Sequence, residues 1–217
     1  WSGGNSAGLL SISGFNSLQQ LGQLEVDENI HLNSCCKLLD LASFANSTIT
    51  INNNGSNCSS LIGTASVCGT SFCGTPGYTT MLSQQSEVDA LAGCTSFSGN
   101  LTIDGNASGS NITNLDSLIN LTTVNGIFKI EDVFAQSELP CLQLTNVGDL
   151  QIKQSIFTNI LFPSLSTVNN NIQIEYTYLD SLNFEALTDV QDIQIGPYNG
   201  FQNGLGTNFS INTFNSL

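Results

Sequence analysis

The chain has 217 residues, 40% of them hydrophobic, so it can bury the core of one large domain or two small ones, and disorder is disfavoured. Seventeen acidic residues against three basic ones give a formal net charge of −14. This balance argues against nucleic acid as a partner, because neutralising phosphates takes basic side chains. No run of about 18 apolar residues occurs, so we expect no direct membrane insertion.

Six of the seven cysteines lie between residues 35 and 94, and their spacing predicts a segment stapled by disulfides. A metal site would need Cys-x-x-Cys pairs or histidines at fitting distances, but the only histidine is His31. Six cysteines allow fifteen pairings, and the sequence does not choose among them. The seventh, Cys141, is expected to be a small buried apolar residue, with an intermolecular bridge as the alternative. The disulfide candidates are Cys35, Cys36, Cys58, Cys68, Cys73 and Cys94.

The segment 82–94, "LSQQSEVDALAGC", predicts a short helix. Ser86 stands three residues before Asp89, as in a capping box, Val88 and Leu91 share one face, and Gly93 marks the end. Because this helix precedes a series of strand-like triplets, we expect it to cap the open edge of that series.

Five triplets of the form apolar, polar, isoleucine follow, and their final isoleucines are 27, 22, 22 and 21 residues apart. Alternation within each triplet predicts a strand with both apolar residues on one face, and a period of 20 to 30 residues predicts stacked turns. The final isoleucines are expected to form one buried column across a parallel sheet. They are Ile103, Ile130, Ile152, Ile174 and Ile195.

Between the triplets, apolar residues recur about every third position, which would also suit amphipathic helices. Pro163, β-branched residues and Asn/Gly clusters interrupt these segments, so short strands and turns fit better. A single turn cannot bury its own apolar face, and the turns must therefore stack into an all-β solenoid.

The stretch "SEVDALAGCTSFSGNLTIDG", followed by "LDSLINLTTVNGIFKI", resembles the receptor L-domain and its relatives in fungal wall proteins and in bacterial, Bacteroidetes-like secreted proteins. The resemblance implies a leucine-rich-repeat-like β-solenoid with parallel sheets and a short capping helix. It also implies an extracellular location and no catalytic residues. One departure is "GQLEV" at 22–26, which lacks the second glycine of the usual pair and leaves the conformation of one corner open.

The same resemblance extends upstream and gives the expected domain organisation. Residues 1–70 resemble the last turns and the Cys-rich end cap of one solenoid unit, 71–98 a linker and capping helix, and 99–217 a second solenoid unit. The segment "LSISGFNSL" at 10–18 returns as "FSINTFNSL" at 209–217. This repetition suggests a tandem array in which the second unit continues beyond the end of the chain, although a chance match is the alternative.

No motif points to catalysis or to a cofactor. His31 is expected in a surface turn, without partners for a nucleophilic triad. The pairs Asp27-Glu28 and Glu131-Asp132 could serve a glycosidase, but adjacent acids after a strand are more typical of a solvated face. No calcium-loop motif occurs. We therefore predict a protein that is not an enzyme, with no cofactor and no metal site.

Asn-x-Ser/Thr matches are numerous, and this composition produces most of them by chance; they matter only in a eukaryotic secretory pathway. They occur at Asn46, Asn54, Asn57, Asn100, Asn106, Asn111, Asn120 and Asn208.

The outward residues of successive triplets suggest a binding face. They are Thr102, Lys129, Gln151, Gln173 and Gln194, which is not the threonine ladder of an ice-binding surface. Glutamines can hydrogen-bond to sugars or to another protein, and aromatic residues after the strands can stack on a saccharide or anchor an interface. The candidate ligand-binding residues are Gln151, Gln173, Gln194, Tyr176, Tyr178 and Tyr198.

Two functions remain open. The first is an extracellular, cell-surface module that binds a surface glycan or a protein ligand through a non-catalytic solenoid face. The alternative is a structural repeat unit of a fibre, filament or layer, whose partners are neighbouring copies of itself.

Overall fold

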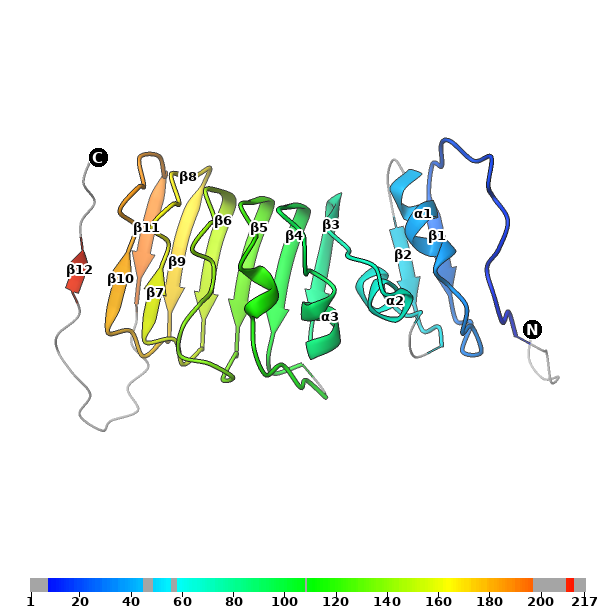
Figure 1. The fold of residues 1–217 in the computed structure, drawn as a ribbon, viewed down its shortest axis with the longest axis horizontal. Coiled ribbons are helices and arrows are strands. Elements are labelled where there is room, and N and C mark those ends of the chain that lie inside the picture. The colour runs from blue at the N-terminus through cyan, green and yellow to red at the C-terminus, as the bar shows by residue number, and fades with distance from the viewer. Residues whose placement is uncertain (1–7, 45–48, 56–57, 108, 197–209, 213–217) are drawn as a thin grey trace. The chain divides into compact units, whose positions relative to one another are not determined.

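A computed structural model describes residues 8–44, 49–55, 58–107, 109–196 and 210–212. The chain divides into two compact units, Trp1–Phe72 and Cys73–Leu217 (Figure 1). The described residues are mostly β, with parallel sheets and few helices, which agrees at this level with the all-β prediction.

The first unit is built around a parallel strand pair. Strands β1 (Leu24–Asp27) and β2 (Ile49–Asn52) pair from Leu24 with Ile49 to Asp27 with Asn52. Helix α1 (Lys37–Phe44) lies between the two strands in the chain, and helix α2 (Leu61–Cys68) follows β2. The Ser60 side chain caps α2 by accepting a hydrogen bond of 3.0 Å from the Gly63 amide.

All six clustered cysteines are paired. Cys35–Cys58 and Cys36–Cys68 fasten the start of α1 to both ends of the α2 region, and Cys73–Cys94 lies within the second unit. These three disulfides indicate an extracellular or otherwise oxidising environment. Cys141 is free and buried.

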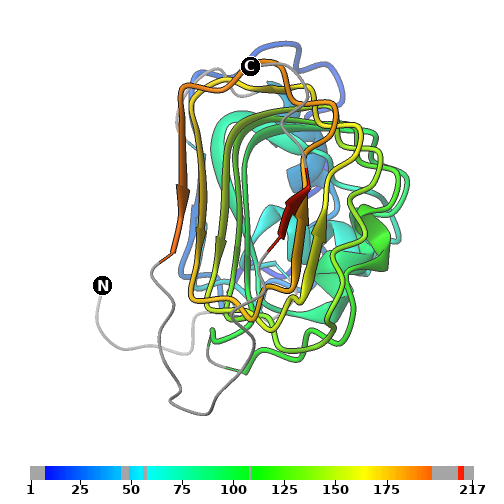
Figure 2. The same cartoon turned by 90° about the vertical axis from the view of Figure 1, so that its left-hand side faces the viewer.

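The second unit carries a seven-stranded parallel sheet in the order β11-β9-β6-β5-β4-β3, with β8 paired to β6. A smaller parallel sheet has the order β12-β10-β7. The chain passes from one sheet to the other, and the two line opposite sides of the unit (Figure 2). The large-sheet strands are β3 (Gly74–Leu82), β4 (Ser96–Asp104), β5 (Thr123–Glu131), β6 (Asn146–Lys153), β8 (Thr167–Val168), β9 (Asn171–Glu175) and β11 (Asp192–Ile195). The small-sheet strands are β7 (Asn159–Leu161), β10 (Ser181–Asn183) and β12 (Ser210–Asn212).

The final isoleucines of the five triplets are register partners along the large sheet, from Ile103 on β4 to Ile195 on β11. The first four are at most 1% exposed, whereas Ile195 is 37% exposed. The difference follows from topology, because β11 is the edge strand of this sheet and no other strand of the described residues pairs with its outer side.

Strand β3 was not anticipated, because its segment was predicted as part of the linker and capping helix in 71–98. Its residues Thr80-Met81-Leu82 pair in register with Leu101-Thr102-Ile103 of β4. Thr80 is 2% exposed and occupies the inward position that the other triplets fill with an apolar residue. A threonine there hides the apolar alternation, so the pattern does not identify this strand.

The predicted capping helix exists as α3 (Gln85–Asp89), but it lies in the crossover from β3 to β4 and not ahead of the first strand of the sheet. Its start also differs from the prediction. The Glu87 carboxylate accepts hydrogen bonds from the Ser83 and Gln84 amides at 2.8 and 3.0 Å, so Gln84, and not Ser86, is the N-cap. Val88 and Leu91 are buried, as the sequence pattern predicts.

Successive turns are also joined by hydroxyl groups at the corner where the chain enters β5, β6 and β8, and at the equivalent position ahead of β11. We call this set the hydroxyl ladder: each side chain donates to the backbone carbonyl of the equivalent residue one turn earlier, over 2.7 to 3.2 Å. The donors are Thr122, Thr145, Ser166 and Thr188, and the first acceptor is the Thr95 carbonyl.

Candidate functional site

The outer face of the large sheet gathers the polar residues that alternate with its buried columns. Lys129, Gln151, Gln173 and Gln194 are successive register partners in one row. The first three are half-buried and Gln194 is exposed, while Thr102, at the start of this row, is buried between its partners Met81 and Lys129. Two of the three basic residues in the chain, Lys129 and Lys153, lie on this face.

A cluster around Glu175 organises one end of the face. The Glu175 Oε1 atom accepts hydrogen bonds of 2.9 Å from the amide nitrogens of both Gln173 and Gln194. Its Oε2 atom lies 3.7 Å from the Lys153 ammonium. We call these four residues the Glu175 cluster.

The Glu175 cluster fixes side chains that would otherwise rotate freely. The Glu175 side chain is 11% exposed, so its charge is balanced by Lys153 and by two amide donors in a partly desolvated setting. Among the described residues, no hydrogen bond uses the amide oxygens of Gln173 and Gln194. Those oxygens are therefore available as fixed acceptors for a ligand's hydroxyl or amide group.

A second ion pair lies further along the face. The Lys129 Nζ atom is 2.6 Å from Glu131 Oε1. Both lysines of the face are thus paired with carboxylates, and amides lie beside these pairs.

The two described tyrosines of the predicted site follow β9 directly. Tyr176 is half-buried and has a backbone φ of 55°, a conformation that residues other than glycine rarely adopt. Tyr178 is 39% exposed, and the buried Thr177 separates the two. Tyr198, the third predicted tyrosine, lies outside the described residues.

Tyr178 has equivalents in the two preceding turns that the sequence reasoning missed. Phe134, Ile156 and Tyr178 each stand four residues after a column isoleucine and are 22 residues apart. Phe134 is 60% exposed and Ile156 half-buried, and the Ile156 amide donates to the Val133 carbonyl at 3.3 Å. We call these three residues the corner ridge. The sequence signal for this ridge is an apolar or aromatic residue four positions after each of three successive column isoleucines.

The paired carboxylates do not form an isolated acid–base couple. Glu131 is bound to Lys129. Loss of hydration raises the pKa of the neighbouring Asp132, and the nearby Asp104 and Glu131 charges raise it further, while Lys129 partly offsets the effect. His31 lies in an exposed turn, and the Asp27 carboxylate accepts a hydrogen bond of 2.9 Å from the Glu28 amide.

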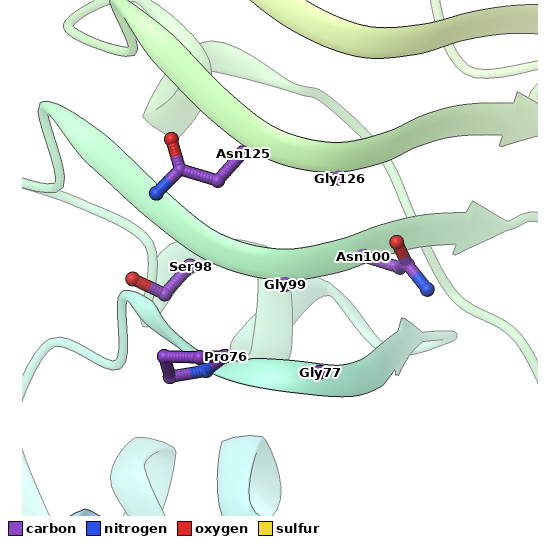
Figure 3. Close-up of a pocket in the computed structure, with 7 residues that line it drawn as sticks. All are labelled: Pro76, Gly77, Ser98, Gly99, Asn100, Asn125 and Gly126. Atoms are coloured by element: carbon purple, nitrogen blue, oxygen red, sulfur yellow. The ribbon is translucent and has the colours of Figure 1, made fainter.

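A pocket of about 360 Å³ lies over β3, β4 and β5, where the strand register shifts (Figure 3). The Asn100 amide is already occupied there: its oxygen accepts from the Ile127 amide and its nitrogen donates to Thr79, at 2.9 and 3.0 Å. No lining residue is titratable. The lining consists of Pro76, Gly77, Ser98, Gly99, Asn100, Asn125 and Gly126.

Close packing of neighbouring strands requires glycine at position 126 in this pocket. A Cβ atom at this position would lie 2.7 Å from the Gly99 carbonyl oxygen, so the adjacent strands approach too closely for a side chain. The pocket floor is therefore backbone, and the pocket offers small polar groups without acid–base chemistry.

Across the described part of the chain, no group of three or more His, Cys, Asp or Glu side chains is placed to hold a metal ion. In the same residues, no helix is both long and apolar enough to cross a membrane. Comparisons with protein-family models, with curated proteins and with solved structures find no match to this chain.

Proposed function

We propose that the chain is a non-catalytic binding module of the extracellular cell surface. In this proposal its second unit is a leucine-rich-repeat-like β-solenoid of receptor L-domain type. The regular return of the chain to the large sheet supports this fold, because Ile130, Ile152 and Ile174 are register partners 22 residues apart. Three disulfides support the location.

The observation that carries the binding proposal is the Glu175 cluster on the large sheet, with the exposed Tyr178 three residues after Glu175 in the chain. Glu175, the last residue of β9, holds two glutamine amides in place at 2.9 Å each, and Tyr178, three residues further on, is 39% exposed. Fixed amides together with an exposed aromatic ring close in the chain suit a ligand with hydroxyl groups and an apolar face, such as a glycan, or a polar protein loop. Holding the amides before binding lowers the entropy cost of ordering them.

The test is a binding screen of the secreted chain against an immobilised glycan panel and a panel of extracellular matrix proteins. A ligand found in either panel is then titrated against Gln173→Ala and Tyr178→Ala, and the matched control is Glu185→Ala. Glu185 is exposed and follows β10 of the other sheet. We expect affinity to fall at least tenfold in the first two variants and to stay unchanged in the control. Equal losses in all three, or no ligand in either panel, would contradict the proposal.

One observation favours the second candidate, a structural repeat unit of a surface fibre, filament or layer. Ser11 forms a parallel bridge with Ser34 in the first unit, and Ser210 is the parallel partner of Ser181 in the second. Both serines open the same two letters, Ser-Ile, within the repeated segments 10–18 and 209–217. A repeat at equivalent pairing positions is what a tandem array would contain. Sedimentation of the purified chain over a range of concentrations tests it, since a constant monomer mass would contradict assembly.

A further inference from the structure

The Asn-x-Ser/Thr matches differ in exposure and in whether the asparagine side-chain nitrogen, Nδ2, makes a hydrogen bond within the fold. An N-linked sugar is attached to Nδ2, so an acceptor must be exposed and must not need that nitrogen within the fold. Asn46, Asn57 and Asn208 lie outside the described residues, and the matches at Asn54 and Asn106 include residues 56 and 108, which also lie outside them. Asn54 is kept because hydrogen bonds define what its own amide does, and Asn106 is set aside. The remaining matches are Asn54, Asn100, Asn111 and Asn120.

Two of these four use Nδ2 inside the fold. Asn54 is 7% exposed, and its Nδ2 donates to the Val26 carbonyl at 2.8 Å. Its oxygen also accepts from the Asn29 amide at 3.1 Å. Asn100 ties β3 to β5 with both ends of its amide, as described above. A sugar at either position would replace a bond that joins neighbouring strands or turns.

The other two are exposed and lie in one segment, the crossover from β4 to β5. Asn111 uses only its oxygen, which accepts from the Gln85 amide at 2.7 Å at the start of α3. Asn120 follows the short helix η1 (Asp116–Leu118) in a turn, and its side chain makes no hydrogen bond among the described residues. Both Nδ2 atoms are therefore without partners in the described part of the chain.

The crossover around Asn111 is firmly held. The Gln85 side-chain oxygen accepts from the Thr113 and Asn114 amides at 2.7 and 3.0 Å, and the Gln84 amide nitrogen donates to the Gly109 carbonyl at 2.8 Å. Asn111 is thus presented at a defined place on the surface.

We propose that Asn111 and Asn120 carry N-linked glycans and that Asn54 and Asn100 do not. In the transfer, a bond forms between Nδ2 and the anomeric carbon of an oligosaccharide. The donor is a lipid-linked oligosaccharyl diphosphate of the secretory pathway. The bond from the anomeric carbon to the diphosphate oxygen breaks, the lipid diphosphate leaves, and the amide loses one proton. The three disulfides are consistent with passage through that oxidising pathway.

The placement has a consequence for the binding face. The crossover from β4 to β5 contains η1, and η1 lies on the side of the second unit opposite the large sheet (Figure 2). Glycans there shield that side and leave the Glu175 cluster and its sheet face uncovered.

The test is a peptide map of the chain isolated from its natural source and of the chain secreted by cultured eukaryotic cells. Peptide-N-glycosidase treatment in heavy-oxygen water converts each glycosylated asparagine into a labelled aspartate. We expect label at positions 111 and 120 and unmodified asparagine at 54 and 100. Unmodified Asn111 and Asn120 in the natural material, or label at position 54 or 100, would overturn the proposal.

Gel mobility of variants gives an independent readout. Asn120→Gln and Asn111→Gln should each remove one glycan from the secreted chain, and the matched control Asn100→Gln should remove none. Because Asn111→Gln also disturbs the contact with Gln85, the wild-type peptide map decides that site if the variant is not secreted.

Discussion

The Thr145 hydroxyl donates a hydrogen bond of 3.0 Å to the backbone carbonyl of Thr122, 23 residues earlier in the chain. The Thr145 and Asn146 amides donate to the same carbonyl at 2.8 and 3.3 Å, so one oxygen accepts three hydrogen bonds from the next turn. The hydroxyl ladder repeats this arrangement from turn to turn. It fixes the corner at which the chain enters β5, β6 and β8, and the equivalent position ahead of β11.

Replacing Thr145 with Val should lower the free energy of unfolding by about 0.5–1 kcal/mol, because the isosteric side chain loses one partly solvated hydrogen bond. The measurement is urea denaturation followed by circular dichroism. Thr123→Val is the control, since the half-buried Thr123 makes no side-chain hydrogen bond among the described residues, and it should change stability by less than about 0.5 kcal/mol. Equal effects at both positions would count against the ladder.

Ile174→Ala should destabilise the second unit by about 2–5 kcal/mol, because it opens a cavity between β6 and β11. Ile174 is 1% exposed, whereas its partner Ile195 is 37% exposed, so Ile195→Ala should cost clearly less. Thermal or urea denaturation of the two variants gives the comparison. Similar losses would mean that the two positions are equally buried in solution.

The isoleucine column was predictable because each triplet carries its own alternation and the spacing repeats at nearly constant length. Both signals are local in the sequence. Strand β3 lacked the first signal, since Thr80 replaces the apolar residue, and its pairing with β4 depends on contacts that the triplet pattern does not encode.

Other features depended on three-dimensional neighbours and could not be chosen from the sequence. The pairing of Cys36 with Cys68, for example, was one of many possibilities until α1 and α2 were placed. The Glu175 cluster was missed for the same reason, because Glu175 meets Lys153 and Gln194 only across strands. The glutamine row itself was predictable from the period-two pattern.

Thr80→Val should stabilise the protein by about 1 kcal/mol. Thr80 Oγ1 is the one buried side-chain nitrogen or oxygen among the described residues that has no hydrogen-bond partner, and removing an unsatisfied hydroxyl recovers its desolvation cost. The neighbouring Thr79→Val is the control with the opposite sign, because Thr79 accepts the bond from Asn100. Melting temperatures of both variants test the pair, and a destabilised Thr80→Val protein would show that its hydroxyl is satisfied.

Asp132→Asn should raise the melting temperature at pH 7. The pKa of Asp132 is higher in the folded state than in the unfolded state. The free energy of unfolding therefore falls as the pH rises from the unfolded pKa through the folded pKa, because the folded state disfavours the charged carboxylate. Asparagine removes the charge and tolerates the φ of 54° at this position. The gain should vanish below the ordinary aspartate pKa of about 3.9, where the wild-type side chain is protonated as well. An equal gain in melting temperature at pH 3 and pH 7 would mean that the stabilisation comes from the backbone conformation of asparagine and not from loss of the charge.

Cys141 should be unreactive in the native protein. Its side chain is fully buried, and burial raises its pKa, so neither access nor thiolate formation favours reaction with a thiol reagent. Colorimetric titration should find no reactive thiol in the native chain and one after denaturation without reductant. All seven cysteines should react after reduction, because the other six are paired. A native thiol that reacts within seconds, or a covalent dimer on a non-reducing gel, would restore the alternative of an intermolecular bridge through Cys141.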